Sequence, residues 1–359
     1  MSNIKEDIFN TQKSEKFVSK LIDIINYGSL NIMISIGYRT ALFDKMSGLQ
    51  PSGSSEIAEK AGLHERYVRE WLGAMVTGGI VDYDPVNKLY SLPAEHAAWL
   101  TRDATPDNVA VTTQWFSVLA SVEDKILDCF KNGGGLSYSD YCRFHEVMAD
   151  ESRQTVIVPL IDQLLPLAGD IIDRLKEGIK VLDLGCGSGL ALVEMAKIFP
   201  ESSFTGYDLS QDAVDTGMKN AGELGLKNIT LKAKDISELD EKEEYDFITT
   251  FDAVHDQAKP DLVLKNIFNA LKSDGTYFMQ DIAGSSFVEK NMDHPIGSFL
   301  YTISCLHCMS VSLGQDGKGL GAMWGKELAV EMLNEAGFSD IEVKELPHDP
   351  INYYYIVRK

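Results

Sequence analysis

Three glycines spaced two residues apart place the strongest constraint on how this chain folds. They follow a short apolar run, in the segment Val181-Leu-Asp-Leu-Gly-Cys-Gly-Ser-Gly189, and apolar residues at helical spacing continue over Leu190–Phe199. Glycine tolerates positive φ and lets a ligand lie against bare backbone. The pattern therefore predicts a strand, a tight turn and a helix whose first N–H groups and dipole face a ligand.

An acidic residue ends the next predicted strand. Asp208 lies 23 residues after Gly185, in Phe204-Thr-Gly-Tyr-Asp-Leu209. A carboxylate at this position can accept both hydroxyls of a ribose. The glycine spacing is G-x-G-x-G, unlike the G-x-G-x-x-G dinucleotide fingerprint, so an adenosyl group is the predicted ligand. A sheet that binds another nucleotide, or none, remains the alternative.

The second half of the chain alternates between predicted strands and helices. We predict strands at 179–184, 203–208, 229–233, 246–251 and 276–281, followed by an antiparallel pair at 340–346 and 352–358 around a loop with Pro347 and Pro350. Such alternation indicates an α/β fold, a doubly wound Rossmann-like parallel sheet with helices on both faces and a C-terminal antiparallel hairpin. We expect this domain to span 177–359, with an insertion at 283–325.

The sequence of the N-terminal part predicts a mostly helical winged-helix domain over 1–105. A helical connector at 106–176 is expected to join this domain to the sheet. Residues 15–46 are helical by spacing and apolar on more than one side, which suggests burial against a second subunit. A short helix capped at Ser54, a helix at 65–77 and a hairpin around Asp84-Pro85 complete the winged helix. Residues 1–100 hold ten Lys and Arg against twelve Asp and Glu, which favours a homodimerisation role over DNA binding.

The Asp-Leu-Gly-Cys-Gly-Ser-Gly189 wording resembles motif I of class I S-adenosylmethionine-dependent methyltransferases. The resemblance implies S-adenosyl-L-methionine as cofactor and, through the family's acid after the third strand, a bond from the adenine amino group to Asp235. An ordinary helix cap at Asp235 is the alternative. The residues expected to contact the cofactor are Asp183, Gly185, Gly187, Gly189, Asp208, Leu209, Asp235, Ile236, Phe251 and Asp252.

His255 is the candidate catalytic base. It lies after the fourth predicted strand, where open α/β sheets place their ligands, and imidazole suits proton removal from an acceptor at neutral pH. His255-Asp256 followed by a helix resembles the catalytic region of plant-type small-molecule O-methyltransferases, which also carry an N-terminal winged-helix dimerisation domain. Their aromatic residue after His-Asp is Gln257 here, so a histidine that only caps the helix or contacts cofactor remains open.

Two segments outside the glycine turn are expected to contact the methyl acceptor. Tyr141–Met148 and the aromatic, Met-rich insertion resemble a bacterial and invertebrate group of winged-helix methyltransferases whose substrates are poorly defined. Core packing is the alternative role for the insertion. Cys305-Leu-His-Cys308 lacks a second cysteine pair, so we predict no metal site. The candidate acceptor contacts are Tyr141, Arg143, His145, His307 and Trp324.

Composition and charge limit the classes of molecule that the protein is expected to bind. The 359 residues carry a net charge of −21, which repels nucleic acid and acidic membranes. No signal pattern or bilayer-length apolar run is present, and five cysteines favour reduced thiols, so a cytoplasmic location is expected. We predict methyl transfer to a small hydroxyl or thiol compound. A transcriptional regulator that uses the methyltransferase fold as a ligand sensor is the rival hypothesis.

Overall fold

The computed structural model describes residues 9–346 and 349–359. The chain forms two compact units, which divide between Ser117 and Val118. The predicted connector at 106–176 straddles this division. In the part that the structure describes, no helix is both long and apolar enough to cross a bilayer.

The first unit is the winged helix that the sequence predicts. Two short helices and an antiparallel hairpin pack around a core with Phe43, Trp71 and Met75 at its centre. The indole N–H of Trp71 donates to the carbonyl of Met33 at 2.8 Å, which ties the long first helix to this core. The elements are α1 (Thr11–Arg39), α2 (Leu42–Met46), α3 (Ser54–Ala61), α4 (Glu65–Thr77), β1 (Asp82–Asp84), β2 (Leu89–Ser91) and α5 (Ala94–Leu100), with 3-10 turns η1 (Arg102–Ala104) and η2 (Thr112–Gln114).

Two local predictions for this unit were wrong. The helix expected over 15–46 breaks after Arg39, because Ala41 adopts the left-handed conformation with φ of 58°. Ser54 does not cap α3. Gly53 is the N-cap residue, and the hydroxyl of Ser54 instead donates to the carboxylate of Glu65 at 2.6 Å.

The second unit is built on a seven-stranded sheet with the order β5-β4-β3-β6-β7-β9-β8. The first five are parallel, and β9 runs antiparallel to both of its neighbours. All seven predicted strands are confirmed. Pro350, expected in the final loop, lies inside β9, and Pro347 is outside the described residues. The strands are β3 (Lys180–Leu184), β4 (Ser203–Asp208), β5 (Ile229–Ala233), β6 (Tyr245–Phe251), β7 (Leu271–Ile282), β8 (Asp340–Leu346) and β9 (Asp349–Arg358).

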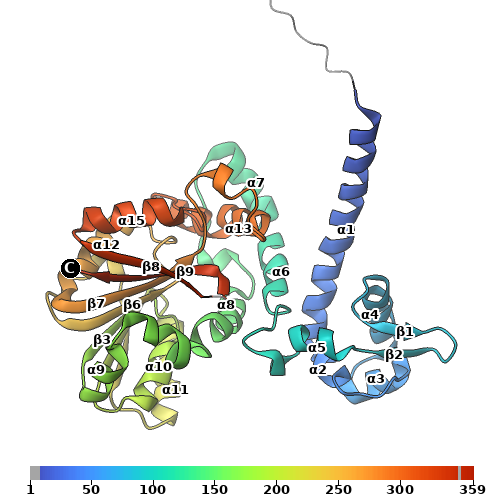
Figure 1. Cartoon of the computed structure of the whole chain (residues 1–359), viewed down its shortest axis with the longest axis horizontal. Helices are drawn as coiled ribbons and strands as arrows, with labels where there is room; N and C mark the ends of the chain where they lie inside the picture. Colours follow the sequence, from blue (N-terminus) through green and yellow to red (C-terminus); the bar gives the residue numbers. More distant parts are fainter. Residues whose placement is uncertain (1–8, 347–348) are drawn as a thin grey trace, which may run out of the picture. The chain divides into compact units, whose positions relative to one another are not determined.

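Helices cover both faces of this sheet (Figure 1). Leu192 of α10 belongs to the core on one face and Ile267 of α12 to the core on the other. The doubly wound α/β fold is thereby confirmed. The main helices are α7 (Glu123–Asn132), α8 (Phe144–Ser152), α9 (Ile171–Glu177), α10 (Leu190–Ile198), α11 (Gln211–Glu223), α12 (Pro260–Ala270), α13 (Gly297–Ile303), α14 (Met309–Gly314) and α15 (Gly325–Ala336), while α6 (Trp115–Ala120) spans the division between the units.

Short turns connect these helices, and three of them have π-helical hydrogen bonding. The π-helical turns are η4 (Arg153–Ile157), η5 (Leu160–Leu164) and η9 (Ser304–Cys308). The 3-10 turns are η3 (Tyr138–Asp140), η6 (Leu165–Ala168), η7 (Ile236–Glu238) and η8 (Val288–Lys290).

Strand order reverses at β3, since β4 lies on one side of it and β6 on the other. Ligands of open α/β sheets bind beyond the carboxyl ends of the strands at such a switch point. The loops after β3, β4, β6 and β7 are therefore where the candidate site is built.

Candidate functional site

The glycine turn between β3 and α10 has the backbone that its sequence requires. Gly185, Gly187 and Gly189 all have positive φ, of 72°, 54° and 68°. A Cβ at Gly185 would come within 2.7 Å of Ala253, and one at Gly189 would meet Leu231 at the same distance. A Cβ at Gly187 would meet nothing within 4 Å. Gly187 therefore borders open space, which is the room that a ligand lying on the backbone needs.

Asp208 closes the other side of this turn. One carboxylate oxygen accepts from the N–H of Gly187 and the other from the N–H of Ser210, both at 2.8 Å. Leu209 beside it is exposed. The structure therefore brings the predicted ribose acid and the central glycine of the turn into direct contact.

Asp235 and Ile236 follow β5. The carboxylate of Asp235 caps η7 by accepting from the N–H of Ser237 at 2.8 Å, which is the alternative role left open for it. Ile236 is buried in the core that contains α12. The predicted adenine contact of Asp235 stays a prediction.

Asp183 is a buried acid in the middle of the sheet. Its carboxylate accepts from the hydroxyl of Thr249 at 2.8 Å. Burial raises the pKa of Asp183 to about 7, although the Thr249 hydrogen bond acts in the opposite direction. Asp183 thus holds a proton more readily than an ordinary aspartate does.

Phe251 and Asp252 begin the turn after β6. Asp252 has φ of 51°, a conformation uncommon outside glycine that often marks a functional turn. One of its oxygens accepts from Gln280 at 3.1 Å, and the other is buried without a hydrogen bond from any described residue. Burial, followed by the charge of Asp281, raises the pKa of Asp252 to about 8. A buried oxygen without a donor suits a ligand that brings an N–H or O–H group.

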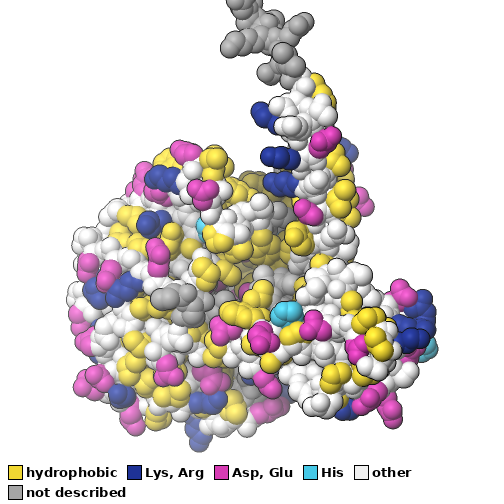
Figure 2. Space-filling model, turned by 45° about the vertical axis from the view of Figure 1, so that its right-hand side comes forward, with side chains coloured by type: hydrophobic (Ala, Val, Ile, Leu, Met, Phe, Trp, Pro, Cys, Tyr) yellow, Lys and Arg dark blue, Asp and Glu magenta, His cyan; other side chains and the backbone are white. Residues whose placement is uncertain are grey.

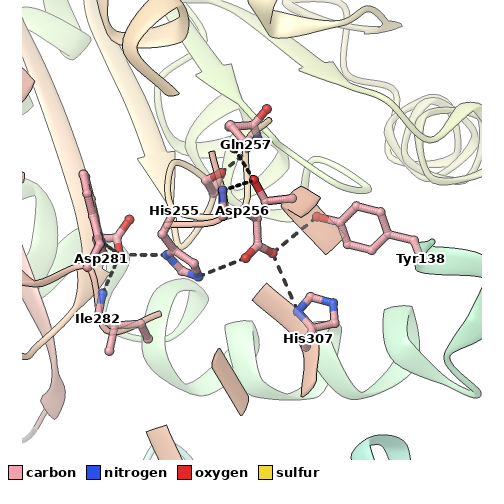
Figure 3. Close-up of polar contacts among 11 residues, drawn as sticks. Tyr138, His255, Asp256, Gln257, Asp281, Ile282 and His307 are labelled. Atoms are coloured by element: carbon pink, nitrogen blue, oxygen red, sulfur yellow. Dashed lines mark hydrogen bonds and ion pairs between the residues drawn. The ribbon is translucent and has the colours of Figure 1, made fainter. Parts of the chain in front are cut away.

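His255, in the same turn, is buried between two carboxylates (Figure 3). Its Nδ1 lies 2.8 Å from Asp281 and its Nε2 lies 3.3 Å from Asp256. Burial opposes the imidazolium, but the charges of Asp281 and Asp256 outweigh it and raise the pKa of His255 well above its ordinary value. The arrangement stabilises a proton on this ring.

Asp281, at the end of β7, holds the histidine in place. A single oxygen of this carboxylate also accepts from the indole of Trp324 at 2.9 Å and from the N–H of Ile282 at 2.8 Å. Trp324 was predicted as an acceptor contact, and the structure places it as a support for Asp281. Such a fixed carboxylate sets the orientation and tautomer of a histidine.

The segment around Tyr141 packs on η9 beside this histidine. Phe144 stacks on His307 with ring centroids 4.4 Å apart, and Tyr141 donates to the carbonyl of Leu306 at 2.6 Å. Tyr138 donates to Asp256 at 3.3 Å, and His307 Nδ1 lies 3.8 Å from the same carboxylate oxygen. Tyr141 and His307 thus lie beside each other near His255, and their role as acceptor contacts stays a prediction.

Arg143 and His145 flank Phe144 at the start of α8. The guanidinium of Arg143 bonds to Glu146 at 2.7 and 2.9 Å. His145 is exposed and makes an edge contact with Phe144. Their contact with the acceptor stays a prediction.

Sequence reasoning missed four residues of the cluster, namely Tyr138, Asp256, Asp281 and Cys308. Asp281 could have been found from the sequence, because an acid at the carboxyl end of a buried strand is where open α/β sheets place functional residues. Cys308 belongs to the C-x-x-C pair, which predicted no metal site, and its grouping with His255 and Asp256 depends on the fold.

Two family models match the chain. Residues 28–102 match an Rv2258c-like winged HTH domain, and residues 175–337 match a methyltransferase domain. Among curated relatives, the malonyl-[acyl-carrier protein] O-methyltransferase of Bacillus cereus is 27% identical over 163 residues, 44% of this chain and 53% of that protein. The (S)-coclaurine N-methyltransferase of Papaver somniferum is 31% identical over 109 residues, 30% of this chain and 31% of that one. The chain thus spans about half, or less, of the length of these relatives.

Solved structures share the fold over nearly the whole chain. Human N-acetylserotonin methyltransferase, solved in complex with SAM, superposes with a TM-score of 0.69 at 15% identity and covers 100% of this chain and 99% of its own. Mitomycin 7-O-methyltransferase superposes with a TM-score of 0.68 at 17% identity, covering 98% and 100%. The matched models and the shared fold agree in pairing an N-terminal winged helix-turn-helix domain with a C-terminal methyltransferase domain.

Proposed function

We propose that the protein transfers a methyl group from S-adenosylmethionine to a hydroxyl or thiol of a small molecule. The observation that carries this proposal is the hydrogen bond between the open Gly187 backbone and Asp208 at the carboxyl end of the sheet. The loop after β6 at the same end holds His255, which is hydrogen-bonded to the buried carboxylate of Asp281. The methyltransferase-domain match supports the cofactor class.

The chain's own residues suit this cofactor. Asp208 already accepts from two N–H groups, and its carboxylate is placed to receive ribose hydroxyls beside the open face of Gly187. The buried free oxygen of Asp252 is available to a donor group of the ligand. When bound, S-adenosylmethionine supplies an activated methyl group on a sulfonium centre.

His255 is the proposed base. Its Nδ1–H is held by Asp281, so Nε2 takes the proton of the acceptor once it has lost the proton that the two carboxylates stabilise. The two carboxylates on either side stabilise the resulting imidazolium. Tyr141 and His307 then border the acceptor, while Arg143 and His145 contact it only if their segment moves toward the cluster.

We further propose that the chain acts as a homodimer in the cytoplasm. The exposed helix α1 has large apolar side chains with 40–67% of their surface accessible, which a second copy would cover. The five free thiols support a reducing compartment, and the net charge of −21 opposes nucleic acid as an acceptor.

Calorimetry with S-adenosylhomocysteine tests the cofactor half of the proposal. We expect binding by the wild type and by Asp212→Ala, a control on the exposed first turn of α11, and at least tenfold weaker binding by Asp208→Ala. Equal affinity in all three proteins would remove the basis for the cofactor assignment.

A screen over thiols, phenols and amines with His255→Gln tests the base. For a hydroxyl acceptor we expect a loss of about 10²- to 10⁴-fold in rate near neutral pH, the usual contribution of a positioned base. An acidic thiol needs less help and should lose far less. A His255→Gln protein that methylates a phenol as fast as the wild type would contradict the role of His255.

A further inference from the structure

The turn after β6 and the π-helical turn η9 bring three potential metal ligands together. One ligand atom each of His255, Asp256 and Cys308 lies within 4.8 Å of the others, and all three residues are buried. π-Helical turns often occur at functional sites. We propose that these three side chains bind a divalent transition-metal ion, of which Zn²⁺ is the type case, and that the ion takes the Nε2 of His255.

The donor set fits this class of ion. Imidazole nitrogen, carboxylate oxygen and thiolate sulfur are the three ligand types of protein zinc sites, whereas Mg²⁺ and Ca²⁺ take oxygen ligands. Tetrahedral bonds of about 2.0 Å to nitrogen and 2.3 Å to sulfur separate the ligand atoms by roughly 3.3–3.5 Å. Side-chain shifts on the order of 1 Å therefore bring the three atoms to ligand distances.

The surroundings of His255 are those of a metal-bound histidine. A ligating histidine usually donates its other ring N–H to a carboxylate, which fixes the ring. Asp281 accepts this bond from Nδ1 at 2.8 Å and is itself fixed by Trp324 and Ile282. Nε2 is thereby directed at Asp256 (Figure 3).

Among the described residues, positive charge in the cluster comes from histidine alone. In the ion pairs formed by residues 9–346 and 349–359, only histidines face the carboxylates of Asp256 and Asp281. One oxygen of Asp281 is buried without a hydrogen bond from any described group. Buried carboxylates are paired or coordinate metals, and a divalent ion on Nε2 would take the place of the His255 proton between these carboxylates.

Metal binding would regulate the proposed methyl transfer, a consequence that rests on the function proposed above. An ion on Nε2 occupies the lone pair with which His255 would accept a proton. The metal-loaded protein is therefore the inhibited form for acceptors that need the base, and a chelator restores activity.

The experiment is a metal titration of the full-length chain after chelator treatment, read by calorimetry and elemental analysis. We expect one Zn²⁺ per chain and at least a tenfold loss of affinity in Cys308→Ala. Cys305→Ala is the matched control, because Cys305 lies in the same turn but outside the ligand group, and it should bind like the wild type. With Co²⁺ as probe, a thiolate-to-metal charge-transfer band should be present in wild type and Cys305→Ala and absent in Cys308→Ala.

Absence of stoichiometric Zn²⁺ binding by the wild type overturns the metal site, as does equal affinity in both variants. Unchanged circular dichroism of Cys308→Ala shows that a loss of binding is not a loss of folding. Calorimetry with S-adenosylhomocysteine on the same preparations separates the two proposals. Cofactor binding without Zn²⁺ binding overturns only the metal site, and Zn²⁺ binding without cofactor binding overturns only the proposed function.

Discussion

At the scale of single residues, Asp183 shows how a buried acid couples stability to pH. Its pKa is about 7 in the folded chain because burial disfavours the charged form, against roughly 4 for an unfolded aspartate. Because the pKa of Asp183 is higher in the folded than in the unfolded chain, its contribution to the free energy of unfolding is fully present below the unfolded pKa. This contribution is lost as pH rises through about 7.

Asp183→Asn removes this pH-dependent cost. We expect the unfolding temperature of the variant, relative to the wild type without ligand, to improve from roughly pH 4 to about pH 7 and to level off above it, measured by differential scanning calorimetry. The exposed Asp274→Asn is the control and should show a constant difference over that range. A pH-independent difference for Asp183→Asn would mean that the carboxyl stays ionised in the folded protein.

At the scale of elements, alanine substitutions at two glycines distinguish the effect of backbone strain from the effect of ligand contact. Gly187 and Gly225 both have positive φ, of 54° and 71°, and a Cβ at either would meet nothing within 4 Å. Alanine at each should cost about 1–2 kcal/mol, the usual penalty for the left-handed conformation. We expect Gly187→Ala alone to weaken binding of S-adenosylhomocysteine, by calorimetry, because only its Cβ would point into the ligand space. Parallel losses of affinity in both variants would contradict this placement.

Elements with local signals were predictable, and contacts between distant elements were not. The strand, glycine turn and helix at 180–198 could be predicted because their signals are local. An apolar run, glycines two residues apart and apolar residues at helical spacing all lie within this short segment. The neighbours of His255 lie 26 and 53 residues further along, at Asp281 and Cys308, and are brought together only by strand order and by the π-helical turn. The end of α1 before Ala41 was not predictable, because the left-handed residue there is an alanine and not a typical turn residue.

At the scale of the whole molecule, the proposed homodimer rests on the exposed apolar side chains of α1. Its large apolar side chains are exposed over most of its length, and Figure 2 shows them along the helix between charged groups. Ile25 is 67% exposed, so its replacement by Glu disturbs little of the packing within the chain. The exposed apolar side chains are Phe17, Val18, Leu21, Ile22, Ile24, Ile25, Tyr27, Ile32 and Ile36.

We expect the wild type to sediment as a dimer and Ile25→Glu to shift toward monomer, in analytical ultracentrifugation. Lys20→Glu makes a larger charge change on the same exposed helix and should leave the dimer intact if apolar burial drives association. Equal behaviour of Ile25→Glu and the wild type would move the interface elsewhere on the chain.

The packing of Tyr141 and Phe144 against η9 gives the chain a built-in reporter position. Between these two anchored rings lies Cys142, which is exposed, while Cys308 is buried and the other three thiols are partly buried. A thiol-reactive dye should therefore attach first at this site. Its emission would follow the segment beside His307 in real time as ligands are added, without any change to the sequence.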